Sequence, residues 1–84
     1  MLTAAQIRSA RALLGWSQSE LVTKTALSPT TIKRMESEGV GPERSSAGNV
    51  DTVRKALEAA GVEFIPENGG GAGVRWAKRK DAIQ

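Results

Sequence analysis

Apolar residues recur three or four positions apart through most of the first sixty positions, which is the spacing of amphipathic helices. This pattern predicts four helices, at about 3–14, 18–25, 29–37 and 49–60. The predicted apolar stripe of the first helix consists of Ile7, Ala10, Leu13 and Leu14. Its predicted outer surface carries Gln6, Arg8, Ser9 and Arg11. The expected fold class is therefore mostly α.

Short polar motifs predict where the first two helices begin and end. Thr3 with Gln6, and Ser17 with Glu20, have the spacing of a capping box, in which two side chains satisfy each other's free backbone N–H groups. Gly15 can take the left-handed conformation that ends a helix.

The third and fourth helices have simpler start signals. Ser28 is an N-cap candidate, and Pro29 suits the first helical position because its missing N–H costs nothing there. Asn49 is expected to cap the fourth helix, which ends before Gly61. Residues 40–48 form a polar loop, expected to be exposed and able to lie over a partner.

After residue 61 the helical spacing is lost. Residues 62–65 and 74–76 are rich in β-forming side chains, and a glycine-rich segment joins them, which predicts a short C-terminal β-hairpin. A hairpin alone is marginal in water, so its apolar residues need cover from helices one and four or from the hairpin of a second subunit. The resulting candidates for a dimer interface are Val62, Phe64, Ile65, Val74 and Trp76.

These elements divide the chain into a helical domain at 1–61, a hairpin at 62–77 and a basic, flexible tail at 78–84. The sequence contains no cysteine and no histidine. This composition excludes disulfides, the usual zinc sites and catalysis by Cys or His. Asp51 and Glu58 are the nearest to a carboxylate pair, and no pocket is evident around them. We expect no enzyme activity, no cofactor and no metal.

The balance of 12 basic and 9 acidic residues gives a net charge of +3. A basic surface favours anionic partners such as nucleic acid, through phosphate neutralisation. No apolar run approaches the roughly 20 residues that span a bilayer. The first sixteen residues carry arginines inside a helical pattern, unlike a signal peptide. We therefore expect a cytoplasmic protein with no membrane partner.

The segment from Trp16 to Glu36 contains two predicted helices joined by a tight turn, the outline of a helix-turn-helix. Its pattern, W-S-Q-x-x-L followed by S-x-x-T-I-x-x-x-E, is carried by Trp16, Ser17, Gln18, Leu21, Ser28, Thr31, Ile32 and Glu36. This pattern resembles the Cro/cI-like (Xre-type) helix-turn-helix family of transcriptional regulators. The turn usually holds a glycine where this chain has Ala26, so the turn is either strained or less left-handed.

The resemblance implies a recognition helix at 29–37 that enters the major groove of DNA. The implied base-contacting residues are Pro29, Thr30, Lys33 and Arg34. The expected contacts to the DNA backbone are Ser17, Gln18, Ser28, Thr31 and Arg44. The resemblance implies the contact of Gln18, while Ser17 and Ser28 are expected at helix N-termini and Arg44 in the loop. Arg34 is the strongest candidate because its planar fork can bond O6 and N7 of guanine together.

Each of these assignments has a structural alternative. Arg34 could be a solvated charge, and Lys33 could pair with Glu36. In this family a glutamine in the position of Gln18 contacts phosphate or braces a recognition-helix side chain. Ser17 and Ser28 have a sufficient role as caps. Glu36 is expected to pair with a basic residue of the first helix, for which the candidates are Arg8 and Arg11.

Three further features have mainly structural interpretations. Trp16 is expected to pack in the core, with base stacking as the remote alternative. The run Gly69–Gly73 lacks the ending of a phosphate-binding loop and is expected to form the hairpin turn. Basic residues of the tail could track DNA, although a solvated tail is more frequent; they are Lys78, Arg79 and Lys80.

The first functional hypothesis is a regulator that binds an inverted-repeat operator in double-stranded DNA as a homodimer. The second is an antitoxin or antiactivator that acts mainly by binding an unknown partner protein, with DNA binding secondary. A third, an architectural or phage-type recombination factor, shares the DNA-binding step. Substitution of the exposed residues of the recognition helix separates the first hypothesis from the second.

Overall fold

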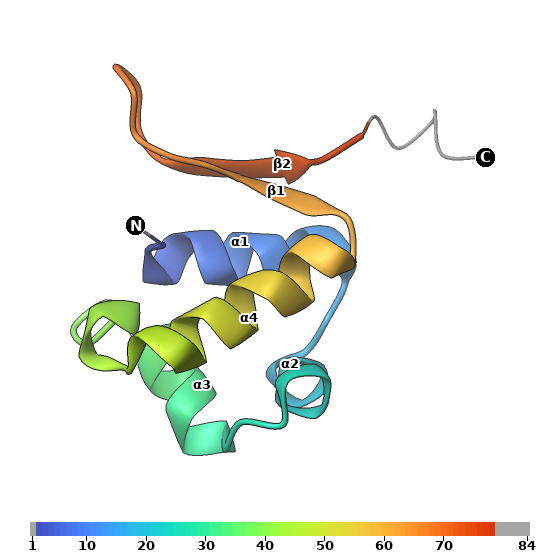
Figure 1. The fold of residues 1–84 in the computed structure, drawn as a ribbon, viewed down its shortest axis with the longest axis vertical. Coiled ribbons are helices and arrows are strands. Elements are labelled where there is room, and N and C mark those ends of the chain that lie inside the picture. Colours follow the sequence, from blue (N-terminus) through green and yellow to red (C-terminus); the bar gives the residue numbers. More distant parts are fainter. Residues whose placement is uncertain (1, 79–84) are drawn as a thin grey trace.

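The computed structural model describes residues 2–78, and this part of the chain is mostly helical (Figure 1). Its elements in chain order are α1 (Ala4–Leu14), α2 (Gln18–Thr25), α3 (Pro29–Met35), a 3-10 turn η1 (Pro42–Arg44), α4 (Ala47–Ala59), β1 (Val62–Ile65) and β2 (Gly73–Trp76). In Figure 1, α1 and α4 lie between the α2–α3 pair and the hairpin. The prediction of a mostly α-helical chain with a C-terminal hairpin is confirmed.

Both predicted capping boxes are present. The Thr3 hydroxyl accepts the backbone N–H of Gln6, and the Gln6 side chain accepts the backbone N–H of Thr3. Ser17 and Glu20 make the same two bonds at the start of α2. Gly15 ends α1 with a φ of 69°, in the left-handed region. Local polar spacing therefore determines these helix boundaries.

The turn between α2 and α3 is left-handed at Ala26, with a φ of 60°. That conformation strains a residue with a Cβ atom, so the first of the two expectations for this position is confirmed. The buried Thr25 hydroxyl supports the turn, since it donates to the Leu21 carbonyl at 2.7 Å and accepts from the Leu27 N–H at 3.3 Å. These bonds hold the backbone where a glycine would reduce the strain.

α3 ends at Met35, two residues before the predicted end. Glu36 is its C-cap, and the main-chain carbonyl of Glu36 accepts a hydrogen bond from the Arg8 side chain. A side chain from α1 thus satisfies a carbonyl that another turn of helix would otherwise use.

α4 begins at Ala47, so the prediction that Asn49 caps this helix is wrong. The Ser46 hydroxyl accepts the backbone N–H of Asn49 at 3.1 Å and is the actual cap. A serine cap three residues upstream adds a turn, despite the low helix propensity of the glycine within it. The preceding loop is shorter than expected and contains η1. Its Pro42 is buried, which contradicts a fully exposed loop.

Apolar residues from all four helices and β1, together with Leu2 ahead of α1, form one core. They are Leu2, Ile7, Ala10, Leu21, Ile32, Met35, Val53, Leu57 and Val62. Leu14 and Trp16 pack against it, as predicted for Trp16. Leu13 is 37% exposed instead of joining the apolar stripe. Adjacent helical positions differ by about 100° around the axis, which turns Leu13 away once Leu14 faces the core.

The strands pair antiparallel, with Val62 opposite Trp76 and Phe64 opposite Val74. Because strand side chains alternate, these four residues share one face, which packs on the helical core next to α1 and α4. Ile65 lies on the opposite face. The chain's own helices α1 and α4 therefore cover this face, which was the first of the two expected kinds of cover.

Gln6 is buried, so its predicted place on the outer surface is wrong. Its Nε2 donates to the carbonyls of Gly73 at 2.8 Å and Ile65 at 3.3 Å, while its Oε1 completes the capping box. One side chain therefore ties the start of α1 to the loop end of the hairpin. The error arises because these partners lie up to 67 positions away in sequence.

Candidate nucleic-acid interface

α3 presents the predicted base-contacting residues on one exposed side. Ile32 and Met35 are buried and anchor this helix on the core. The exposed residues are Pro29, Thr30, Lys33 and Arg34. They fall one and four positions apart, which places them in two adjacent rows on the helix. The structure thus brings all four together on a surface open to solvent.

The predicted backbone-contacting residues lie at the starts of α2 and α3, within α3 and on η1. Ser17 and Ser28 are exposed at the N-termini of α2 and α3, where both act as caps. The Thr31 hydroxyl is 2.9 Å from that of Ser28. Arg44 is exposed on η1, which packs against α3. Free N–H groups at helix N-termini suit phosphate, and the contacts themselves remain predictions.

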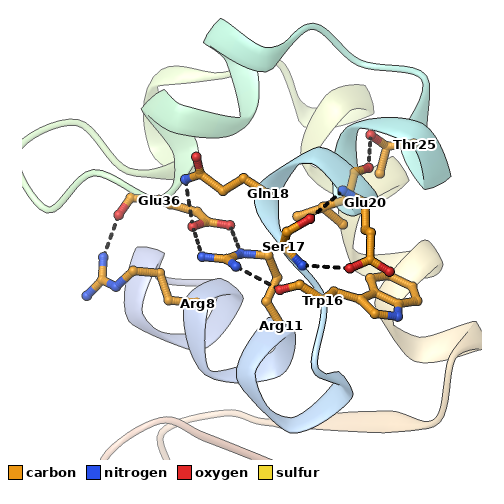
Figure 2. A network of polar contacts seen from close by, with 9 residues as sticks. Arg8, Arg11, Trp16, Ser17, Gln18, Glu20, Thr25 and Glu36 are labelled. Atoms are coloured by element: carbon orange, nitrogen blue, oxygen red, sulfur yellow. Dashed lines mark hydrogen bonds and ion pairs between the residues drawn. The ribbon is translucent and has the colours of Figure 1, made fainter.

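A buried carboxylate holds the three N-terminal helices together, as Figure 2 shows. Glu36, whose side chain is only 2% exposed, accepts two hydrogen bonds from Arg11. Arg11 Nε lies 2.7 Å from Glu36 Oε2, and Nη2 lies 2.8 Å from Oε1. This paired geometry is the strongest form of an ion pair between side chains. The expectation that Glu36 pairs with α1 is confirmed, with Arg11 as the partner.

Other side chains complete this network. Gln18 Nε2 donates to Glu36 Oε1 at 3.0 Å, and Arg11 Nη1 donates to the Trp16 carbonyl at 2.9 Å. Arg8 bonds the main chain of Glu36 and forms an exposed ion pair with Glu38. The hydrogen bond to Glu36 raises the pKa of Arg11 above its ordinary value, which outweighs the effect of burial. The network fixes α3 relative to α1 and α2.

Gln18 therefore has the bracing role that was one of its two alternatives. Its amide nitrogen is directed to the carboxylate, because a carboxylate can only accept hydrogen bonds. The side chain is half-buried and reaches the surface beside α3. A contact to the DNA backbone remains a prediction for this residue.

Ion pairing leaves a distinct set of cations unneutralised. Within residues 2–78, the basic side chains that form no ion pair are Lys24, Lys33, Arg34, Arg44 and Lys78. All but one of them belong to α2, α3 or η1. Lys33 does not pair with Glu36, because Arg11 and Gln18 already donate hydrogen bonds to that carboxylate.

Sequence reasoning missed Lys24 on α2. Its Nζ lies 5.5 Å from the centre of the Trp16 ring, a cation–π contact that leaves its charge uncancelled. The spacing of a lysine eight positions after a tryptophan carried no signal, because the contact depends on how the chain enters α2.

The remaining candidates lie away from this surface. Phe64, Val74 and Trp76 are half-buried against the chain's own core and Val62 is fully buried, so a subunit contact through them remains a prediction. The run Gly69–Gly73 belongs to the hairpin turn and the start of β2, as expected. Lys78 is exposed. Arg79 and Lys80, predicted as parts of a DNA-tracking tail, lie outside the described residues.

Comparison of the chain with protein-family models, with curated proteins and with solved structures finds no match. Among the helices described for residues 2–78, none is both long and apolar enough to cross a membrane. In the same part of the chain, no three His, Cys, Asp or Glu side chains cluster as a metal site would require.

Proposed function

We propose that this chain is a sequence-specific DNA-binding transcriptional regulator with a Cro/cI-like helix-turn-helix domain. In this proposal α3 enters the major groove and α2 lies across the backbone. The observation that carries the proposal is the exposed side of α3, where Lys33 and Arg34 have no ion pair although the helix is rigidly anchored below them. Free cations on a fixed helix suit a polyanion whose groove has a defined shape.

The exposed residues make different kinds of contact with DNA, some to base edges and some to phosphates. Arg34 bonds O6 and N7 of a guanine, a pairing worth about 1–3 kcal/mol of discrimination between bases. Thr30 offers one hydroxyl and one methyl group to a base edge. Lys33 and Arg44 neutralise phosphates and supply affinity with little dependence on sequence.

The proposal includes a homodimer on an inverted-repeat operator. One recognition helix covers only about one half-site, and two-fold symmetry places two half-sites about one helical turn apart. Sedimentation at tens of micromolar tests this part, and a monomer at that concentration would contradict it.

DNA binding is tested by selecting a duplex from a random pool and titrating the protein against that duplex and against random DNA over a range of salt. Wild type is expected to prefer the selected duplex by about 10³-fold or more. Arg34→Ala should lose roughly 5- to 150-fold of that preference per half-site. Arg75→Ala is the matched control, because that exposed arginine already pairs with Glu63 at 3.1 Å.

Three outcomes separate the hypotheses. Equal, strongly salt-sensitive binding to both DNAs would indicate a generic basic surface rather than a sequence reader. An unchanged preference in Arg34→Ala would remove α3 from base reading. The absence of binding at low salt would favour the antitoxin or antiactivator hypothesis, in which a protein partner is the main ligand.

A further inference from the structure

A hollow of about 420 Å³ opens between α2 and α3, next to the exposed cations. Its lining comes from one side of each helix and consists of Gln18, Ser19, Val22, Thr23, Pro29 and Lys33. Neighbouring members of this set fall one, three or four positions apart within each helix, so they line the side that faces the other helix. The hollow therefore belongs to the surface that α3 would present to the major groove.

Two residues of the lining, Val22 and Pro29, have purely apolar side chains. Val22 is half-buried and packs on the core. The Thr23 hydroxyl donates to the Ser19 carbonyl at 3.1 Å, so it is occupied within α2. The amide nitrogen of Gln18 is likewise occupied, by Glu36. The Ser19 hydroxyl and the amide oxygen of Gln18 remain as polar groups of the lining, beside the hydrocarbon of Val22 and Pro29.

One basic residue, Lys33, belongs to the lining. Lys33 forms no ion pair within the described part of the chain, and Arg34 follows on the same helix. Two apolar side chains beside an unpaired lysine fit a ligand that combines a small apolar group with nearby anions. Charge complementarity therefore favours DNA over an apolar segment of another protein as the occupant.

We propose that this hollow receives the 5-methyl group of a thymine in each half-site, with Lys33 on an adjacent phosphate. In the major groove of unmodified DNA, the thymine methyl is the one apolar group among the base edges. Val22 and Pro29 contact this methyl group and thereby determine specificity at a position that offers them no hydrogen bond. This inference rests on the DNA-binding function proposed above.

The experiment uses the full chain and the duplex selected from a random pool. Each thymine is replaced in turn by deoxyuridine, which removes only the methyl group and keeps base pairing intact. Burial of one methyl group changes affinity by about fourfold, so replacement at the equivalent position of both half-sites should weaken binding roughly 15-fold. One position per half-site should respond in this way.

Variants assign the response to the hollow. Val22→Thr keeps the shape of the side chain but replaces a methyl group with a hydroxyl. It should bind thymine and deoxyuridine duplexes equally, with the affinity of wild type for the deoxyuridine duplex. Pro29→Ala is the second variant, since this residue is exposed and its loss is tolerated at a helix start. Val50→Thr is the control, as another half-buried valine, on α4.

The outcomes distinguish this inference from the function on which it rests. If no duplex is enriched, DNA reading itself fails. If a duplex is enriched and no thymine methyl matters, the methyl site is wrong and the DNA-binding function stands. A methyl preference that survives in both Val22→Thr and Pro29→Ala would also overturn it. Loss of the preference in either folded variant, with Val50→Thr like wild type, supports it.

Discussion

In the part of the chain that the structure describes, basic side chains on the strands and on α4 form ion pairs, whereas those on α2, α3 and η1 do not. On the hairpin and α4, Arg75 pairs with Glu63, and both Arg54 and Lys55 pair with Asp51. On α2, α3 and η1, the exposed cations have no such partners within the described residues. Within residues 2–78, four of the five cations without an ion pair lie on α2, α3 and η1, and the fifth is Lys78 after the hairpin. The proposal of DNA binding therefore rests on the position of the unpaired charge and not on the total.

The same comparison holds for the buried ion pair. Glu36 and Arg11 have side chains that are 2% and 20% exposed, whereas those of Glu63 and Arg75 are 46% and 64% exposed. Water and salt weaken the exposed pair, while the buried pair fixes the helix that carries the free cations. One pair organises the candidate interface, and the other only neutralises charge.

Glu36→Gln should have the largest effect on stability. The substitution leaves the half-buried Arg11 without a charged partner and points an amide donor at other donors. Loss of a buried partner costs about 3–5 kcal/mol, and the lower end applies because Arg11 is partly exposed. Thermal unfolding should shift down by roughly 10–20 °C. Glu63→Gln is the control and should cost less than about 1 kcal/mol; equal effects would contradict the comparison.

Gln6→Glu should have the next largest effect on stability. A glutamate keeps the capping-box acceptor for Thr3 but turns a charge toward the carbonyls of Ile65 and Gly73. The expected cost is about 1–3 kcal/mol, with faster amide exchange in the hairpin than in α3. Glu20→Gln, at the same position of the α2 capping box, is the matched control. Unchanged exchange in the hairpin would show that Gln6 acts only as a cap.

Lys33→Ala should change the salt dependence of DNA binding more than its specificity. The slope of log K against log salt should fall by about 0.9 per half-site, because one phosphate contact is lost. Lys55→Ala is the control, since its Nζ already pairs with Asp51 at 2.9 Å. If the slope changed equally in both variants, an ion pair within the protein would not prevent a lysine from contacting a DNA phosphate, which contradicts the comparison.

Asp51→Asn should have the smallest effect, visible as a change with pH. Hydrogen bonds from Arg54 and then Lys55 lower the pKa of Asp51 below its ordinary value of 3.8. Because the pKa of Asp51 is lower in the folded state, its ionised carboxylate stabilises the protein at any pH above the pKa of the unfolded chain. This contribution is lost as the pH falls through the pKa of the folded state. The melting temperatures of wild type and Asp51→Asn should therefore differ slightly near pH 6 and converge once the pH falls below the lowered pKa of Asp51. A difference that grows on acidification would contradict this sign.

Local spacing in the sequence determined the helices and most of their ends. The capping pairs at Thr3 and Ser17 act within four residues, and so does the cap at Ser28. Such pairs give the same bonds in almost any fold, which is why α1 and α2 have their predicted bounds. The error at Asn49 was also local, since Ser46 was the better placed cap.

The sequence also determined which residues lie on the exposed side of α3, because Ile32 and Met35 define its buried side by helical periodicity. The tertiary structure alone decided which cations remain unpaired, since Glu36 and Arg11 are 25 positions apart and each had several possible partners. It alone buried Gln6 under the hairpin and opened the hollow between α2 and α3. Contacts between distant segments depend on how the helices pack, and no spacing along the chain encodes that packing.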